Sequence, residues 1–258
     1  MIWILAGTRD GREIAADLAR LRREEVLVSV VSDYGRKLAE TANVKVLVGK
    51  FDEQAMAGVI NKYGINLLVD ASHPYAEKVT ATAEQVCLDL KIGYLRYERP
   101  VLPLPDYDKL VVVPTVQEAA QAAANFGKTI FLTTGSRALA VFAQSPELAS
   151  HRLIARILPD AAVLGECLAL GFMPRDIVAL QGPFSHSLNK ALFTDYGAEV
   201  VIMKNSGFIG GSDSKISAAM ELGLAIVVIE RPAALPNSER LLFSDSRALF
   251  AYIEEVYP

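Results

Sequence analysis

Short apolar runs alternate with amphipathic segments along the whole chain. The runs are rich in β-branched residues, and the segments between them repeat apolar residues at helical spacing. This alternation is typical of βαβ units wound around a parallel sheet. Helices are predicted in the first half at Arg12–Arg23, Arg36–Thr41, Glu53–Tyr63 and Ala76–Leu90. Strands are predicted at Ile2–Leu5, Val26–Ser32, Val44–Val48, Leu67–Ala71, Tyr94–Tyr97, Leu110–Val113, Thr129–Thr133, Arg152–Ile157, Ile177–Leu180, Val200–Met203 and Ile226–Ile229.

The segment 99–105 interrupts the alternation. It reads Arg-Pro-Val-Leu-Pro-Leu-Pro, and prolines at this density cannot continue a helix or a central strand. A domain boundary is therefore predicted here, with one domain over residues 1–100 and a second over residues 101–258. The expected fold class is α/β, with two Rossmann-like domains whose parallel sheets are flanked by helices and a cleft between the domains.

The two halves carry a weak internal repeat. Leu67–Pro100 and Val200–Pro232 both read strand, polar loop, helix, glycine and strand, and both end in Glu-Arg-Pro. Ligands of open α/β sheets bind beyond the carboxyl ends of the strands. The loops 72–75 and 204–207 are therefore predicted to be counterparts that face the cleft.

Composition narrows the class of protein. The formal charge is −4 and the pI is about 5.5, which argues against a nucleic-acid partner. The two cysteines, Cys87 and Cys167, lie far apart, so neither a disulfide framework nor a metal site is expected. No apolar stretch is long enough to cross a membrane, and Met1–Ala6 is too short for the apolar region of a signal peptide. A cytoplasmic enzyme is expected, while the sequence leaves its oligomeric state undecided.

The first strand-to-helix turn is a candidate dinucleotide site. Gly7, Thr8 and Arg9 follow a strand and open a helix, where backbone N–H groups can hold a pyrophosphate. The turn is not a complete GxGxxG motif, because only Gly7 and Gly11 remain. A tight turn can also use glycine without any ligand.

The end of the second predicted strand normally meets the adenosine ribose. Asp33 there favours NAD, through the 2′-hydroxyl. Ser32, Arg36 and Lys37 favour the 2′-phosphate of NADP, and two cations with a hydroxyl outweigh one acid. A solvated turn with a helix cap is the alternative.

Three further loops contain residues that could bind a ligand or take part in catalysis. Ser72, His73 and Tyr75 place a hydroxyl, an imidazole and a phenol at one strand end, and either Ser72 or His73 could instead cap the next helix. In the second half, the segment 133–137 offers Thr134, Ser136 and Arg137 to a carboxylate or phosphate. An exposed arginine beside a capped helix is the other interpretation. The segment 204–207 includes Lys204 and Ser206 and indicates a polar cleft or a buried contact.

Taken together in order, these segments resemble the precorrin-6A reductase family, including its cobalt-precorrin-6A members. The resemblance spans about residues 2 to 232. Two departures lie in the first turn, where Ala6 replaces a usual glycine and Asp10-Gly11 replaces a usual Glu-Ala. The segments that carry it are Leu5–Thr8, Asp70–Ala76, Arg96–Pro100, Leu132–Gly135, Gly182–Phe184, Lys204–Gly207 and Glu230–Pro232.

The resemblance implies an NADPH-dependent reduction of one double bond in a methylated tetrapyrrole during cobalamin synthesis. It does not decide whether the substrate already holds cobalt. Gly7, Thr8, Arg9, Ser32, Arg36 and Ser72 would bind the cofactor, and His73 and Tyr75 would act at the reacting atoms. Thr134, Ser136, Arg137, Lys204 and Ser206 would bind the carboxylate-rich substrate or hold the nicotinamide end of the cofactor.

Other protein classes remain as alternatives. A short-chain dehydrogenase would need a tyrosine with a lysine four residues later, and no tyrosine here has one. A cofactor-free two-domain tetrapyrrole lyase or a small-molecule binding protein shares the expected bilobal shape. Binding of NADPH separates these from a reductase.

Overall fold

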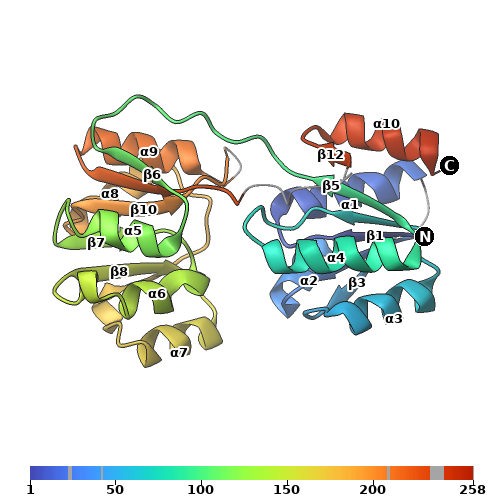
Figure 1. Cartoon of the computed structure of the whole chain (residues 1–258), viewed down its shortest axis with the longest axis horizontal. Helices are drawn as coiled ribbons and strands as arrows, with labels where there is room; N and C mark the ends of the chain where they lie inside the picture. The colour runs from blue at the N-terminus through green and yellow to red at the C-terminus, as the bar shows by residue number, and fades with distance from the viewer. Residues whose placement is uncertain (23–24, 42, 208–209, 233–240, 258) are drawn as a thin grey trace. The chain divides into compact units, whose positions relative to one another are not determined.

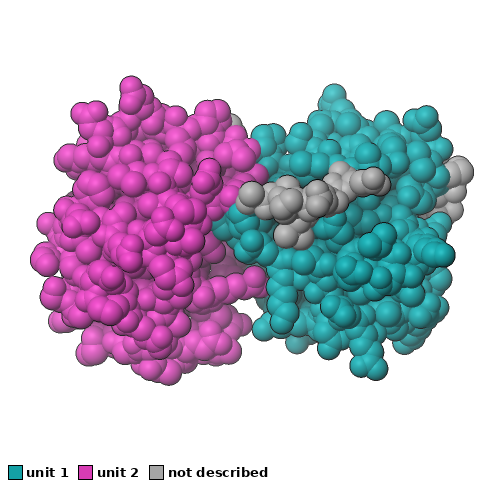
Figure 2. All heavy atoms as spheres, in the orientation of Figure 1, with its two compact units in different colours: residues 1–100, 232–258 teal, residues 101–231 magenta. Residues whose placement is uncertain are grey.

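The computed structural model describes residues 1–22, 25–41, 43–207, 210–232 and 241–257. Within them the chain forms two compact units (Figures 1 and 2). Unit 1 comprises residues 1–100 together with 232–258, and unit 2 comprises residues 101–231. Each unit contains one parallel six-stranded sheet.

Unit 1 winds in the order of a dinucleotide-binding domain. Its sheet order is β12-β5-β4-β1-β2-β3, so the chain first builds outward on one side of β1 and then returns to build on the other. The strands are β1 Ile2–Leu5, β2 Val26–Val30, β3 Val44–Val48, β4 Leu67–Asp70, β5 Gly93–Tyr97 and β12 Leu241–Phe243. The helices are α1 Arg9–Arg22, α2 Asp33–Ala39, α3 Glu53–Tyr63, α4 Glu77–Leu90 and α10 Ser246–Val256.

Helices cover both faces of this sheet (Figure 1). On one face, Ile4 and Val69 belong to a core that α1 and α10 complete. On the other face, Trp3 and Leu68 belong to a core with α3 and α4. Because both faces are covered, strands β1, β2 and β4 are buried at every position and are almost entirely apolar rather than alternating.

Unit 2 repeats the same order of strands. Its sheet order is β6-β11-β10-β7-β8-β9, so β7, β10 and β11 hold the places of β1, β4 and β5. The strands are β6 Leu110–Val113, β7 Thr129–Leu132, β8 Arg152–Ile157, β9 Ile177–Ala179, β10 Val200–Lys204 and β11 Ala225–Ile229. The helices are α5 Val116–Ala123, α6 Leu139–Ala143, α7 Ala161–Ala169, α8 His186–Asp195 and α9 Ser212–Glu221, with short 3₁₀ turns η1 Ser136–Ala138, η2 Pro146–Leu148 and η3 Pro174–Asp176.

The predicted elements agree closely with the observed ones, and the predicted repeat matches the topology of the two sheets. The helix Glu53–Tyr63 has the same bounds in both. Helix α1 begins at Arg9 rather than Arg12, because Thr8 accepts a hydrogen bond from the Gly11 N–H and so caps an earlier turn. The predicted end of this helix, Arg23, lies outside the described residues. None of the helices in the described part of the chain has the length and apolar character that a membrane span requires.

The predicted extent of the second domain needs one correction. Residues 232–258 were expected in it, but the structure groups them with unit 1. Strand β12 pairs with β5 through Leu241–Leu95 and Phe243–Tyr97. Leu249 and Ile253 of α10 are fully buried in the unit 1 core. Apolar burial against unit 1 therefore decides where the end of the chain belongs.

We predict that Leu249→Ala destabilises unit 1 selectively. Removing this fully buried side chain should lower the free energy of unfolding by about 2–5 kcal/mol. Trp3 is the single tryptophan of the chain and is buried in unit 1, so its fluorescence during urea unfolding follows this unit. Leu188→Ala, on the exposed side of α8 in unit 2, is the control. It should change the free energy of unfolding of unit 1 by less than about 0.5 kcal/mol. An unshifted Trp3 transition in Leu249→Ala would contradict the packing of α10 on unit 1.

Candidate functional site

Each sheet has one switch point, which is the place where its winding direction reverses. In unit 1 it lies between β1 and β4, and in unit 2 between β7 and β10. The loops that leave these strands turn away in opposite directions, which makes the carboxyl edge at this point the usual binding position of an open α/β sheet. The predicted segments 6–9 and 72–75 flank it in unit 1, and the segments 133–137 and 204–207 flank it in unit 2.

The first turn of unit 1 is tied to the loop after β4. The Thr8 hydroxyl donates to the Ala71 carbonyl at 3.3 Å and accepts from the Gly11 N–H at 3.2 Å. A side chain at Gly11 would lie 2.8 Å from the Ala6 Cα, so glycine is needed there for close packing of α1 on the sheet. A Cβ at Gly7 would meet nothing within 4 Å. Open space therefore lies beside the Gly7 backbone, where a ligand can approach.

A buried ion pair holds the first turn of α1 to the end of β5. Arg99 Nη1 lies 3.0 Å from Asp10 Oδ2, and both side chains are buried. Burial raises the pKa of the Asp10 carboxyl, against the opposite effect of the Arg99 charge. Neither residue was predicted to belong to the site. The repeated Glu-Arg-Pro triplet was the available signal for Arg99.

Asp70 organises the loop after β4. Its carboxylate lies 2.9 Å from Arg96 Nη1 and accepts hydrogen bonds from the Ser72 N–H, the Thr80 hydroxyl and the Tyr94 hydroxyl. Asp70 is fully buried and Arg96 nearly so. Burial raises the pKa of the Tyr94 phenol, and the Asp70 charge raises it further. This network fixes the path of the chain into the segment that carries His73.

Ser72, predicted to bind the cofactor, belongs to the same network. Its hydroxyl accepts from Arg96 Nη1 at 3.1 Å and lies 3.4 Å from the Thr80 hydroxyl. The side chain is buried, so Ser72 shapes the loop from inside.

His73 and Tyr75, which the sequence suggested as catalytic residues, lie beside each other. Their ring centroids are 5.6 Å apart, and both residues are half-buried. The Tyr75 backbone N–H donates to His73 Nδ1 at 3.3 Å. An accepting Nδ1 places the proton of a neutral imidazole on Nε2.

Ser32 and Arg36 lie together at the start of α2. The Ser32 hydroxyl caps this helix by accepting from the Gly35 N–H at 3.1 Å. Arg36 is exposed and pairs with Asp33 at 3.0 Å, with Glu40 farther off at 3.9 Å. An exposed ion pair of this kind is weak, so Arg36 can leave Asp33 and bind a more strongly charged anion such as a phosphate. Arg9 is also exposed, and its Nε lies 2.7 Å from Glu13 of its own helix.

In unit 2, the turn after β7 contains an unusual hydroxyl. Thr134 is buried, and its Oγ1 makes no hydrogen bond to any residue that the structure describes. Gly135 follows with a φ of 77°, a conformation that favours glycine. Ser136 is half-buried and opens the short turn η1, and Arg137 is exposed.

Arg137 lies close enough to Lys204 to affect its ionisation. Burial lowers the pKa of the Lys204 ammonium, and the positive charge of Arg137 lowers it further. Two like charges at one edge favour an anionic ligand. The structure thus brings together the two cations that the sequence predicted for substrate binding.

Asn205 is mainly structural. The Asn205 side chain makes two hydrogen bonds to the backbone of Leu102, at 2.7 and 3.3 Å. The backbone carbonyl of Asn205 accepts from Arg231 Nε at 3.0 Å. Ser206 is buried, and its N–H donates to the Ser212 hydroxyl at 2.9 Å. Of the two interpretations of this segment, the buried contact applies to Asn205.

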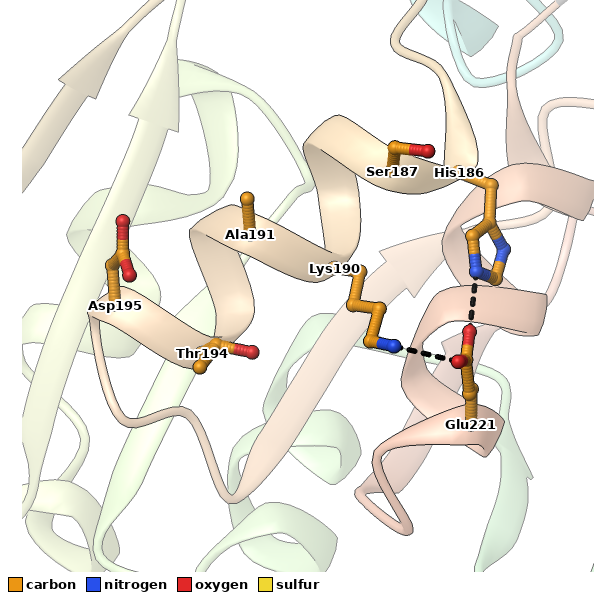
Figure 3. A pocket seen from close by; sticks show the side chains of 7 residues that line it. All are labelled: His186, Ser187, Lys190, Ala191, Thr194, Asp195 and Glu221. Carbon is orange, nitrogen blue, oxygen red and sulfur yellow. Dashed lines mark hydrogen bonds and ion pairs between the residues drawn. The ribbon is translucent and has the colours of Figure 1, made fainter.

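A second cluster of reactive residue types lies away from the switch points. Figure 3 shows His186 and Lys190 of α8 directed at Glu221 of α9, beside a shallow hollow. His186 also contacts the Ser217 hydroxyl at 2.8 Å, and both His186 and Lys190 lie 2.6 Å from Glu221. Hydrogen bonds from Lys190 and His186 lower the pKa of Glu221. The cluster is exposed, and Ser217 lies inside a helix, so we interpret it as a contact between two surface helices.

The remaining predictions concern metals and cysteines. In the described part of the chain, no group of His, Cys, Asp and Glu side chains has a geometry that could hold a metal ion. Cys87 and Cys167 are both buried free thiols. Burial raises the pKa of the Cys87 thiol to about 12, so this thiol stays protonated and unreactive.

We predict that Asp70→Asn destabilises unit 1. The change removes the nearer and fully buried partner of Arg96 and leaves only the 3.7 Å pair with Glu98, at a cost of about 3–5 kcal/mol in the free energy of unfolding. Urea unfolding followed by Trp3 fluorescence measures this cost. Asp17→Asn removes the same charge from an exposed pair with Arg20 and should cost less than about 1 kcal/mol. Equal costs for the two variants would contradict the assigned importance of the network.

Comparison with known proteins places this arrangement in a family. The model of the family described as "Precorrin-6x reductase CbiJ/CobK" matches residues 1–254. A cobalt-precorrin-6A reductase of Priestia megaterium is 40% identical over 233 residues, covering 90% of this chain and 91% of that protein. A precorrin-6A reductase of Mycobacterium tuberculosis is 30% identical over 236 residues, covering 90% and 88%. The solved structure of a CobK precorrin-6A reductase superimposes with a TM-score of 0.80 at 21% identity, covering 98% of this chain and 96% of that one, so the fold is shared. The chain belongs to the precorrin-6x reductase family.

Proposed function

We propose that the chain reduces a double bond of cobalt-precorrin-6A with NADPH, giving the 6B form in cobalamin biosynthesis. The main support for this proposal is the match of the family model to residues 1–254. The cobalt form is preferred here because the relative at 40% identity bears that name, whereas the relative named for the metal-free form is 30% identical.

We infer that unit 1 would hold the NADPH. The open space at Gly7 would let pyrophosphate approach the backbone at the start of α1, a helix of 14 residues. Thr8 holds this turn in place from inside. Ser32 and Arg36 stand at the end of β2, the position of the adenosine ribose, and would hold the 2′-phosphate. Bound there, NADPH would supply the hydride for the reduction.

Unit 2 would hold the carboxylates of the substrate. Arg137 and Lys204 offer positive charge at the carboxyl edge, and the Thr134 hydroxyl, which bonds to no described residue, offers a further donor. Ser136, near the start of the same turn, and Ser206 complete the predicted set. Lys204 is half-buried, and such a lysine gains more from an anion than an exposed one, because less water competes for it. The predicted cleft between the two domains stays a prediction.

The reduction also needs a proton. With Nδ1 accepting from the Tyr75 N–H, the neutral His73 imidazole carries its proton on Nε2. We propose that this Nε2–H donates a hydrogen bond that stabilises charge developing on the substrate, that Tyr75 orients the imidazole, and that water supplies the proton. The Asp70 network, which fixes the loop, would keep the imidazole at a constant position relative to the sheet edge.

Anaerobic turnover tests this function. The purified protein is mixed with cobalt-precorrin-6A or precorrin-6A, each with NADPH or NADH, and the nicotinamide absorbance and the tetrapyrrole product are followed. Oxidation of NADPH with formation of the 6B product is expected. A protein that does not change NADPH fluorescence on mixing would instead be a cofactor-free lyase or a binding protein.

We predict that Arg36→Ala weakens binding of NADPH much more than binding of NADH. A charge-assisted contact contributes about 1.5–3 kcal/mol, so the dissociation constant for NADPH should rise about ten- to hundredfold. Fluorescence titration of each nucleotide measures this. Arg20→Ala is the matched control, because Arg20 forms the same i, i+3 pair with Asp17 elsewhere on the surface. An equal effect of Arg36→Ala on both nucleotides would remove Arg36 from the phosphate site.

We predict that Lys204→Met raises the Michaelis constant for the tetrapyrrole about ten- to hundredfold and leaves NADPH affinity nearly unchanged. The lowered pKa of Lys204 adds a pH dependence. As the pH rises through this lowered pKa, the ammonium loses its charge and the Michaelis constant should rise. Lys204→Arg should shift this rise to higher pH, because arginine stays protonated. Unchanged substrate kinetics in Lys204→Met, with normal folding, would make Lys204 a structural residue.

A further inference from the structure

Arg156 is a buried cation in unit 2 that no part of the sequence analysis singled out. It lies on β8, and its side chain is only 8% exposed. Burial lowers its pKa to about 10. Taking a guanidinium out of water is costly, and buried arginines are usually compensated by a carboxylate.

Among the described residues, the partners of Arg156 do not include an acid. Its Nη1 donates to Asn189 Oδ1 at 2.8 Å, and its Cζ lies 4.6 Å from the ring centroid of Phe184 and 5.9 Å from that of Phe131. Within the same ranges, the ion pairs of unit 2 involve other residues. The positive charge of Arg156 is therefore held by an amide and two aromatic faces, which leaves its full charge for a ligand.

The surroundings hold the guanidinium in a fixed orientation. Asn189 donates from Nδ2 to the Ser185 carbonyl at 2.9 Å, which turns its Oδ1 toward Arg156. Phe184 is anchored through its own carbonyl, which accepts from the Ser214 hydroxyl at 2.9 Å. A group fixed in advance binds its ligand without a further entropic cost.

The position of Arg156 in the sheet points to the candidate site. Ala155 pairs with Leu132, so Arg156 lies level with Thr133, where the turn after β7 begins. That turn carries the buried Thr134 hydroxyl, which makes no hydrogen bond to a described residue. A cation without a described counter-charge and a hydroxyl without a described partner therefore lie at the carboxyl edges of neighbouring strands.

We propose that Arg156 binds an anionic oxygen group, a carboxylate or a phosphate, of a ligand held at the carboxyl edge of unit 2. Phe184 and Asn189 are positioning residues that hold its guanidinium. Under the proposed function, on which the identity of the ligand rests, the carboxylate would come from the tetrapyrrole and the phosphate from NADPH. The carboxylate is the expected source, because unit 2 carries the predicted substrate residues.

Arg156→Met tests the proposal, since methionine fills a similar apolar volume without the charge. The melting temperature of the ligand-free variant should stay the same or rise, because an uncompensated buried charge is removed. The dissociation constant for cobalt-precorrin-6A, titrated anaerobically without NADPH, should rise about ten- to hundredfold. A rise for NADPH alone would support the anion site with phosphate as its ligand.

Two further variants complete the experiment. Arg156→Lys keeps the charge but loses the planar donor geometry, so it should bind better than Arg156→Met and less well than the unaltered protein. It also serves if Arg156→Met does not fold. Arg175→Met removes a positive charge from an exposed arginine of the same unit, 79% exposed, and should change neither affinity. Unchanged affinity of the Arg156 variants for both ligands would overturn the proposal. Lack of turnover by the unaltered protein would count against the proposed function alone, because these titrations need no turnover.

Discussion

The reversal of winding direction within each parallel sheet constrains everything else in this protein. Because the crossovers are right-handed, the helices lie on one face of the sheet before the reversal and on the other face after it. The loops after β1 and β4, and those after β7 and β10, therefore diverge and expose backbone groups at one edge. Residues far apart in sequence, such as Thr8 and Ala71, come into hydrogen-bonding distance because of this constraint.

The two units treat buried charge differently. In unit 1, Arg96 and Arg99 are each neutralised by a buried carboxylate, from Asp70 and Asp10. In unit 2, Arg156 contacts an amide and two aromatic rings, and the pKa of Lys204 is lowered by burial and by the charge of Arg137. Unit 1 thus uses charge to fix its own loops. Unit 2 keeps positive charge at the edge where a polyanionic substrate would bind, although the whole chain is acidic.

The repeated Glu-Arg-Pro triplets show how one local sequence serves two related frameworks. Arg99 lies 3.0 Å from Asp10 in the turn after β1, and Arg231 donates to the Asn205 carbonyl in the loop after β10. Each arginine follows the strand next to a switch point and holds a loop that borders it. The chemistry of the contact differs, since one partner is a carboxylate and the other a backbone carbonyl. The shared feature is the geometry of the strand order.

The sequence by itself determined the strands β1 to β11 and the helices α1 to α4, because strand and helix periodicities are local properties of the chain. It also located the loops at both switch points, since polar residues directly after apolar strands mark the carboxyl edge of a parallel sheet. It did not place β12, whose three residues Leu241–Phe243 are exposed or half-buried and gain their meaning only from pairing with β5. Nor did it distinguish Ser72, inside the Asp70 network, from a hydroxyl that faces a ligand. The sequence did not identify Arg156 for the same reason, because it shows only an arginine in a strand. The tertiary packing of Phe184 and Asn189 makes Arg156 a buried cation held by an amide and aromatic rings. Burial and charge compensation depend on contacts between distant segments, and these are decided by the tertiary structure.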